Sequence, residues 1–216
     1  MSEPVEARYQ AILKRYWGYD SFRPLQLDAI KSIASGQDTL VLMPTGGGKS
    51  IIYQVPTLAS TGVCIVITPL IALMKDQVDR LRKHRILAEA IHAGRSHREI
   101  DRILDNCIYG DVKFLYISPE RIDSEMFRVR CARMDVALIA VDEAHCISQW
   151  GYDFRPSYLQ IARLRDLCPN TPILALTASA TPKVAEDIMY RLRFDKPNIK
   201  RMSFARSNLS YVVRHT

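Results

Sequence analysis

The sequence has few cysteines and no long hydrophobic run, and each absence excludes a class of protein. Its five cysteines are scattered, odd in number and without a C-x-x-C pair. Disulfide scaffolds and cysteine-rich zinc sites need paired spacings, so we expect reduced, buried thiols and no zinc. No N-terminal stretch resembles a signal peptide, and the longest purely apolar runs, such as 136–141, are too short to cross a membrane. We therefore expect a soluble, cytoplasmic protein without a membrane partner.

Acidic residues are outnumbered by basic ones. The chain has 23 Asp and Glu against 30 Lys and Arg, which gives a formal net charge of +7. This balance suits a polyanionic partner, but many basic proteins bind none, so charge alone leaves that question open. The 216 residues, 48% of them hydrophobic, suffice for one globular domain, or for one domain and the beginning of another.

The glycine pattern of a phosphate-binding loop is incomplete but largely present. The stretch from Thr39 to Ser50 reads T-L-V-L-M-P-T-G-G-G-K-S, with Met43 where the strict pattern has its first glycine. An apolar run before the three glycines and an apolar segment after them predict a strand, a turn and a helix. The backbone N–H groups of such a turn converge on an anion at the positive end of the helix dipole.

A triphosphate fits this loop. Lys49 would reach the β- and γ-phosphates, and the Ser50 hydroxyl would coordinate Mg²⁺. The alternative is a glycine-rich surface turn with a solvated lysine. The predicted nucleotide contacts are Thr45, Gly46, Gly47, Gly48, Lys49 and Ser50.

Strand and helix patterns alternate along the chain. This order predicts an α/β fold, a mostly parallel sheet of about seven strands with helices on both faces. Strands are expected at 40–43, 63–68, 87–92, 114–117, 136–141, 173–176 and 199–204. Helices are expected at 5–16, 24–35, from 50, and at 70–84, 96–107, 157–167 and 182–193, with Ser96 and Glu99 forming a capping box.

Two carboxylates follow the apolar run 136–141, in the sequence D-E-A-H. Open α/β sheets bind ligands at the carboxyl ends of their strands, so both should lie near the phosphate loop. Asp142 would hold Mg²⁺ through water, and Glu143 would orient or deprotonate the attacking water. His145 completes the candidate catalytic set with Lys49. Alternatively, both carboxylates only begin a helix and stabilise its dipole.

Aromatic and basic residues gather in two further segments. In G-Y-D-S-F-R-P-L-Q, Tyr19, Arg23 and Gln26 offer a flat surface, a planar cation and an amide, which suit an adenine ring, or the aromatics simply pack into the core. The loop 146–156 contains Trp150, Tyr152, Phe154 and Arg155. These groups could stack on bases and contact phosphates, or the aromatics could anchor the loop to the domain.

Smaller signals complete the candidate site. Arg121 lies in S-P-E-R-I, a strand-to-helix junction that could meet a phosphate or be an ordinary loop. Ser179 and Thr181 follow the strand at 173–176. Hydrogen bonds from their hydroxyls to the D-E-A-H segment would connect the nucleotide site to the surface, although hydroxyls at a helix start are usually caps.

The order of these segments resembles the RecQ family of superfamily 2 DNA helicases over nearly the whole chain. The segments are G-Y-D-S-F-R-P-L-Q, M-P-T-G-G-G-K-S, T-P-L-I-A-L-M-K-D-Q, S-P-E-R-I, V-D-E-A-H-C-I-S-Q-W-G-Y-D-F-R-P and L-T-A-S-A-T. The resemblance implies a RecA-like lobe that binds ATP and Mg²⁺, with single-stranded and duplex DNA as partners and 3′ to 5′ movement. It assigns adenine binding to Tyr19, Arg23 and Gln26, and DNA coupling to Trp150, Phe154 and Arg155.

The resemblance also implies a domain organisation. Residues 1–205 would form the first lobe and 206–216 the start of a connection to a second, with its arginine fingers and the zinc and winged-helix regions lying outside this chain. We then expect weak nucleotide binding, hydrolysis near background and no unwinding. The cytoplasm of a bacterium is favoured over a nucleus. A P-loop kinase and a nucleic-acid-binding module without turnover are the alternative functions.

Overall fold

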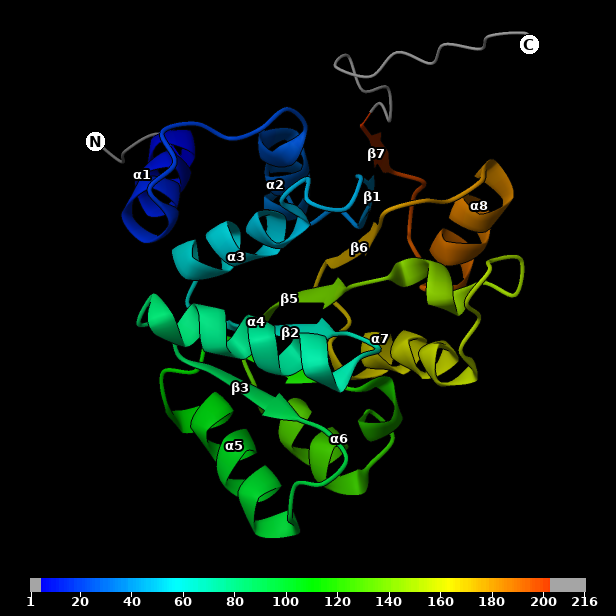
Figure 1. The fold of residues 1–216 in the computed structure, drawn as a ribbon. Helices are drawn as coiled ribbons and strands as arrows, with labels where there is room; N and C mark the ends of the chain where they lie inside the picture. The colour runs from blue at the N-terminus through cyan, green and yellow to red at the C-terminus, as the bar shows by residue number, and fades with distance from the viewer. Residues whose placement is uncertain (1–4, 203–216) are drawn as a thin grey trace, which may run out of the picture.

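The computed structural model describes residues 5–202, and these form a seven-stranded sheet in the order β3-β4-β2-β5-β6-β1-β7 (Figure 1). Every strand pairing is parallel. All seven predicted strands are present. They are β1 (Thr39–Leu42), β2 (Val63–Ile67), β3 (Ala88–Ile91), β4 (Phe114–Ile117), β5 (Val136–Val141), β6 (Ile173–Thr177) and β7 (Ile199–Arg201). The expected end of the last strand and the connection at 206–216 fall outside the described residues.

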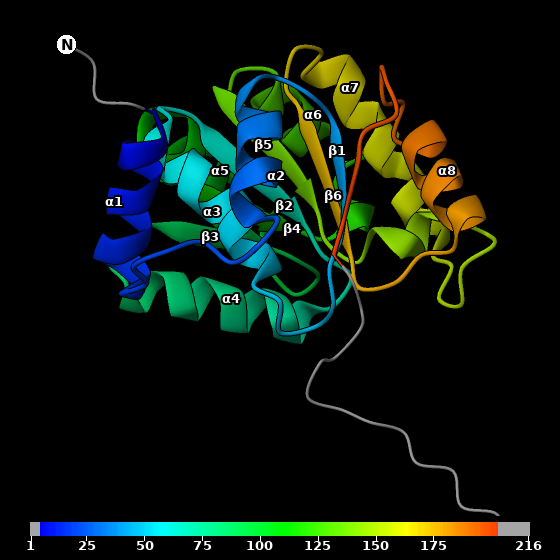
Figure 2. The ribbon, with the colours of Figure 1, turned by 90° about the horizontal axis from the view of Figure 1, so that it is seen from above.

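Helices cover both faces of the sheet, as expected (Figure 2). One buried cluster joins the sheet to α1 (Val5–Trp17), α2 (Gln26–Ala34), α3 (Lys49–Ala59) and α4 (Ile71–Lys83). The other joins it to α5 (His97–Tyr109), α6 (Glu125–Cys131), α7 (Leu164–Leu167) and α8 (Pro182–Arg191). None of the described helices has both the length and the apolar character needed to cross a membrane.

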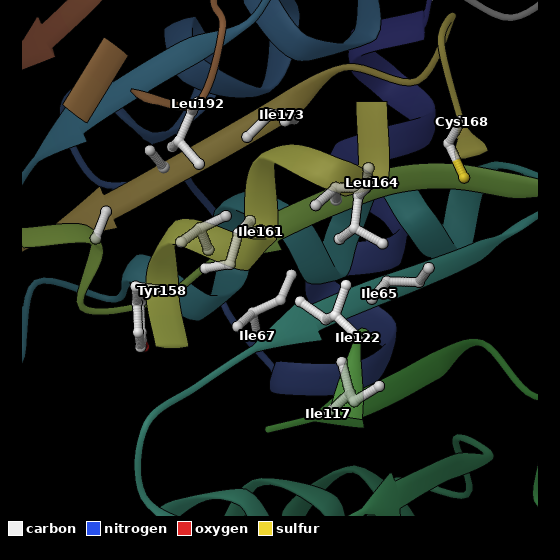
Figure 3. Packing of buried hydrophobic residues seen from close by; sticks show 14 of the residues in the cluster. Ile65, Ile67, Ile117, Ile122, Tyr158, Ile161, Leu164, Cys168, Ile173 and Leu192 are labelled. Atoms are coloured by element: carbon white, nitrogen blue, oxygen red, sulfur yellow. The ribbon is translucent and has the colours of Figure 1, made fainter. Parts of the chain in front are cut away.

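Strand β2 shows why the sequences of the strands are continuous apolar runs. Its Cys64 and Val66 face one buried cluster, whereas Ile65 and Ile67 face the other. A strand covered on both faces needs apolar side chains at every position. Figure 3 shows the second of these clusters, where Ile65 and Ile67 lie among residues from β4, β6 and the segment around α7.

The segment 157–167 differs from the prediction of one α-helix. It is a 3₁₀ helix, Pro156–Arg163, that continues into the single turn of α7. Its buried side chains Tyr158, Ile161 and Leu164 are three residues apart, so they share one face at 3.0 residues per turn (Figure 3). A pattern that predicts a helix over so short a stretch does not distinguish the 3₁₀ period from the α-helical one.

Two other helices differ from expectation. Helix α2 begins at Gln26 rather than at Pro24, because Leu25 has a left-handed backbone with a φ of 75°. Helix α6 was not predicted, although Ser124 caps it by accepting a hydrogen bond from the Phe127 N–H. The capping box of α5 is confirmed: Ser96 and Glu99 each accept a hydrogen bond from the other's backbone N–H.

Asp38 connects four segments beneath the amino ends of the strands. Its carboxylate pairs with Arg165 and accepts hydrogen bonds from the N–H of Ile173 at 2.8 Å and of Asp195 at 3.4 Å. Arg165 also donates to the Thr171 carbonyl at 3.1 Å. Both charged side chains are largely buried, at 14% and 9% exposed. This network fixes β1 beside β6, and so fixes the two loops that follow those strands.

The Asp38→Ala substitution should lower the free energy of unfolding by about 3–5 kcal/mol, because it leaves Arg165 as a buried charge without its partner. Urea unfolding of the purified chain measures this. Asp166→Ala is the matched control, since the Arg193–Asp166 pair is 56% and 65% exposed. That substitution should cost less than about 1 kcal/mol. Equal losses in the two variants would contradict the role given to Asp38.

Candidate functional site

The carboxyl ends of β1, β5 and β6 bring the predicted site residues together. These strands are neighbours in the order β5-β6-β1, and the loop after each emerges at the same edge of the sheet (Figure 1). The ammonium of Lys49 lies 3.9 Å from Oε1 of Glu143. Residues separated by much of the chain in sequence thus face each other across one cleft, as the spacing of the motifs predicted.

Two glycines give the loop after β1 its shape. Gly46 and Gly48 have φ values of 79° and 84°, in the left-handed region that glycine adopts without strain. Helix α3 begins at once with Lys49, so its first backbone N–H groups point into the loop. A Cβ at Gly48 would lie 2.5 Å from Nε2 of Gln26. The loop therefore forms a concave surface that only glycine permits, because a side chain at Gly48 would collide with Gln26.

Met43 departs from the strict glycine pattern for a packing reason. Its side chain is fully buried in the cluster between the sheet and α1–α4. A Cβ at Gly47 would lie 2.5 Å from Cγ of Met43 and 2.9 Å from the carbonyl oxygen of Pro44. Gly47, the middle residue of the glycine run, thus leaves room for the methionine, and the loop keeps its path without a glycine at 43.

The segment before α2 supports the loop from the side. The Gln26 side chain donates to the carbonyls of Gly48 at 3.0 Å and Gly47 at 3.5 Å, and its Oε1 accepts from the Arg23 N–H at 2.8 Å. Arg23 donates to the Gly46 carbonyl at 2.6 Å. Tyr19 is 54% exposed beside them. Two of the three residues predicted to hold adenine therefore also hold the phosphate loop.

A cavity of about 760 Å³ joins these parts. Its lining includes most of the predicted nucleotide residues, namely Tyr19, Arg23, Gln26, Thr45, Gly46, Gly48, Lys49, Ser50, Asp142 and Glu143. Helix α4 contributes Gln77, whose amide lies 3.5 Å from the Ser50 hydroxyl. Gln77 ends the T-P-L-I-A-L-M-K-D-Q segment, so the sequence contained this residue without indicating its contact.

The D-E-A-H segment is strained and partly buried. Glu143 has a left-handed backbone, with a φ of 47°, which is uncommon for a residue with a side chain. Asp142 donates its N–H to the Ile67 carbonyl at 2.9 Å, and its own carbonyl accepts from the Tyr158 hydroxyl at 3.0 Å. Only a four-residue 3₁₀ helix follows, Ala144–Ile147, without a side-chain cap. The alternative that these carboxylates simply cap a helix therefore does not describe the segment.

The charges at this edge shift two pKa values. Burial, and then the negative charge of Glu143, raise the pKa of Asp142, which Lys49 only partly offsets. Burial lowers the pKa of His145, although Glu143 acts in the opposite direction. His145 is therefore neutral at neutral pH. The site combines one lysine with two crowded carboxylates, and so favours an added cation bound through oxygen atoms.

Thr177 links β6 to the D-E-A-H segment, which corrects the prediction for Ser179 and Thr181. The Nδ1 atom of His145 lies 2.9 Å from the Thr177 hydroxyl and 3.3 Å from Oε2 of Glu143. The Thr177 hydroxyl donates to the Ser179 carbonyl, and Thr181 caps α8 by accepting from the Val184 N–H. The difference arises because Thr177 ends β6 beside β5, whereas Ser179 and Thr181 lie beyond the sheet edge.

The aromatic loop, residues 146–156, is exposed at its tip. Trp150 and Tyr152 are 61% and 79% exposed, so neither ring is buried in the core, although Tyr152 still contacts the domain. The Tyr152 ring stacks on His145 with centroids 4.7 Å apart, and the Lys183 ammonium lies 3.1 Å from the Trp150 ring centroid. Phe154 is half-buried.

Arg155 and Arg121, the two arginines predicted to contact phosphate, do not lie at the exposed tip of the loop with Trp150. Arg155 pairs with Asp153 at 3.0 Å and donates to the Pro69 carbonyl at 3.3 Å, so its guanidinium ties the loop to the segment after β2. Arg121 ends the three-residue 3₁₀ helix Pro119–Arg121 after β4. Because β2 separates β4 from β5, Arg121 is not part of the cluster around Lys49.

Comparison with known proteins gives a consistent result. The family model described as DEAD/DEAH box helicase matches residues 23–188. The chain is 48% identical over 208 residues to an ATP-dependent DNA helicase RecQ of Bacillus subtilis, covering 95% of this chain and 35% of the relative. It is 41% identical to the ATP-dependent DNA helicase Q5 of Mus musculus, covering 97% of this chain and 22% of the relative. The chain thus spans about a third or less of these relatives.

Solved structures with low sequence identity share the fold. The helicase MrfA superimposes with a TM-score of 0.72 at 18% identity, over 93% of this chain and 33% of that one. The Lhr helicase of Mycobacterium smegmatis, solved with single-stranded DNA and AMP-PNP, gives 0.69 at 20% identity, over 91% and 28%. These are RecA-like helicase domains, which confirms the expected fold class.

Replacing Asp142 with Asn should stabilise the chain at neutral pH. The raised pKa means that the unfolded state ionises first as the pH rises above about 4, so the carboxylate costs stability at pH 7. Thermal unfolding should therefore show a higher Tm for Asp142→Asn at pH 7, with the gain shrinking as the pH is lowered towards 4. Asp111→Asn, which changes an exposed carboxylate, is the control. A lower Tm for Asp142→Asn at pH 7 would refute this view of the site.

Proposed function

Because the chain belongs to the DEAD/DEAH box helicase family and is similar to RecQ helicases along nearly its whole length, we propose that it is the first motor lobe of a RecQ-type DNA helicase. In this proposal residues 1–205 form a RecA-like lobe that binds ATP, and 206–216 begin the connection to a second lobe. The complete enzyme would couple ATP hydrolysis to 3′ to 5′ movement on single-stranded DNA and to duplex unwinding. It would act in the bacterial cytoplasm at the nucleoid, or in the nucleus if the protein is eukaryotic.

The observation that carries this proposal is the pairing of Lys49 with Glu143 above the glycine cradle, at 3.9 Å. The backbone N–H groups of 46–50 would bind the phosphate chain, and Lys49 would neutralise its β- and γ-oxygens. Lys49 is only 13% exposed, so little water screens its charge.

The oxygen atoms of Ser50 and Asp142 are suitable ligands for a hard cation. Such a cation would also offset the negative charge of the two carboxylates, which Lys49 only partly neutralises. Mg²⁺ would neutralise the developing charge on the phosphates. Ser50 would bind it through its hydroxyl and Asp142 through ordered water. Gln77, 3.5 Å from the Ser50 hydroxyl, would hold that hydroxyl in place.

Glu143 is the proposed base for the attacking water. Its strained backbone directs the carboxylate between Lys49 and His145, at 3.9 Å and 3.3 Å. His145 is neutral at neutral pH, and its Nδ1 atom lies within 2.9 Å of the Thr177 hydroxyl and 3.3 Å of Glu143, where it would carry the ring proton. It would thus orient the carboxylate without protonating it, leaving Glu143 free to accept a proton from water.

The aromatic loop is the proposed contact with single-stranded DNA. The exposed Trp150 ring, with Phe154, would stack on bases. Tyr152 stacks on His145, so a base-bound loop would act on the D-E-A-H segment through this contact. Arg155 would connect the loop to the segment after β2 through the Pro69 carbonyl. Arg121, at the strand-to-helix junction after β4, is retained as a candidate contact for a DNA phosphate.

The test is ATP turnover by a protein in which this chain is followed by the second RecA-like lobe of a RecQ relative. Single-stranded DNA should stimulate turnover, and Glu143→Gln should reduce kcat by about 10²–10⁴ while ATP still binds. This chain by itself should turn over ATP near background, because arginine fingers contribute about 10³–10⁵ in rate.

Glu120→Gln, which alters an exposed carboxylate, is the matched control and should retain full activity. Lys49→Ala should abolish turnover. Stimulation by a small metabolite instead of DNA would indicate a kinase. DNA binding without any turnover would indicate a binding module, and either outcome would reject the helicase proposal.

Two substitutions in this chain can separate the contribution of base binding from that of phosphate binding. Tyr19→Ala should weaken ATP binding at least about fivefold, since a base stack contributes about 1–3 kcal/mol, and leave tripolyphosphate binding unchanged. Gln26→Ala should weaken both ligands about tenfold, because it also removes hydrogen bonds to the phosphate loop. Isothermal titration calorimetry measures both, with Tyr190→Ala, at an 82% exposed tyrosine, as control. Unchanged tripolyphosphate binding in Gln26→Ala would show that the loop does not need this support.

A further inference from the structure

The aromatic loop folds back on the D-E-A-H segment and brings three different metal-ligand groups together. The Nε2 atom of His145 lies 3.8 Å from the Cys146 sulfur, and Oδ2 of Asp153 lies 3.6 Å from the same sulfur. All three ligand atoms are within 4.8 Å of one another. We propose that His145, Cys146 and Asp153 form a binding site for a soft divalent cation of the Zn²⁺ class.

The distances fit a tetrahedral ion with little movement. Zinc bonds of about 2.3 Å to sulfur and about 2.0–2.2 Å to nitrogen and oxygen place neighbouring ligand atoms roughly 3.3–3.6 Å apart. The two measured separations from Cys146 exceed this by a few tenths of an ångström at most. The separation between the His145 and Asp153 ligand atoms is at most 4.8 Å, so the Asp153 carboxylate would move towards His145 by up to about 1.5 Å on binding. The Cys146 and His145 side chains are buried, whereas the Asp153 carboxylate is 44% exposed. A cation would therefore enter beside Asp153, where water can supply the fourth ligand.

His145 is already oriented as a metal ligand. Metal-binding histidines almost always use their second ring nitrogen to bond a carboxylate or another acceptor, which fixes the tautomer. Here Nδ1 lies 2.9 Å from the Thr177 hydroxyl and 3.3 Å from Glu143, so the lone pair of Nε2 faces Cys146. The ring of Tyr152 stacks on His145 and holds its plane. The supporting contacts are therefore in place without any ion.

Two features set the selectivity and the cost of binding. A thiol and an imidazole favour zinc over Mg²⁺, which prefers oxygen ligands, so the ion at the nucleotide site would not compete. Arg155 pairs with Oδ2 of Asp153 at 3.0 Å, and this ion pair must break before the oxygen can bind a cation. The thiol proton leaves to solvent as the sulfur–metal bond forms. Binding would tie the aromatic loop, through Asp153, to two residues beside the catalytic carboxylates.

The experiment is a Co²⁺ titration of this chain, without nucleotide or DNA, followed by absorption. We expect one equivalent to bind with the thiolate charge-transfer and intense visible bands of tetrahedral Co²⁺, and Zn²⁺ to displace it. Cys146→Ser should abolish the charge-transfer band. Asp153→Asn, at a half-buried position, should weaken binding at least about tenfold, as should Thr177→Val through His145. Because no step uses ATP, failure here leaves the helicase proposal untouched.

Cys131→Ser is the matched control, because Cys131 is also a buried thiol but lies outside the proposed site, 3.8 Å from Cys168. It should leave the spectrum unchanged. Circular dichroism of each variant checks the fold, and Asp153→Asn tests the site even if Cys146→Ser does not fold. Octahedral Co²⁺ spectra, loss of the bands in Cys131→Ser, or full binding by Asp153→Asn would each overturn the proposal.

Discussion

The site depends on holding two carboxylates beside a single lysine at the carboxyl edge of a parallel sheet. Burial, and then the negative charge of Glu143, raise the pKa of Asp142 and so disfavour its ionised form. Lys49, 3.9 Å from Glu143, offsets only part of this effect. The arrangement persists because β1, β6 and β5 are locked side by side by their ladders and by the buried pair of Asp38 and Arg165 beneath them. The sheet therefore maintains a charge imbalance that a nucleotide and its cation would relieve.

The short segment after β5 serves several neighbours at once. Glu143 faces the phosphate loop, His145 meets β6 through Thr177, and Tyr152 of the aromatic loop stacks on His145. A left-handed backbone at Glu143 makes this possible, because it turns the chain sharply without continuing into a regular helix. A movement of the exposed loop would thus reach the Glu143 carboxylate through the buried His145 ring. The same compactness places Cys146 and Asp153 next to that ring.

The phosphate loop is likewise shaped by residues outside its own pattern. Gln26 holds the Gly48 carbonyl and Arg23 holds the Gly46 carbonyl, so the segment before α2 contributes to the loop's geometry as well as to the proposed base contact. Met43 fills the space beneath Gly47. If these residues bind the base as proposed, base binding and the shape of the loop would depend on the same two side chains, Arg23 and Gln26.

Local patterns in the sequence determined the seven strands, the capping box of α5, the phosphate loop and the position of D-E-A-H at the sheet edge. Apolar runs, glycines and caps act on residues near them in sequence, so they can be read there. A helix was predicted over 157–167, but its 3₁₀ period, which puts Tyr158, Ile161 and Leu164 on one face, was not. Only the tertiary structure decided that Thr177 rather than Ser179 meets His145, that Gln77 reaches Ser50, and that Arg155 binds Pro69. Those contacts join separate strands and loops, and their partners are set by strand order and side-chain direction, which no local pattern contains.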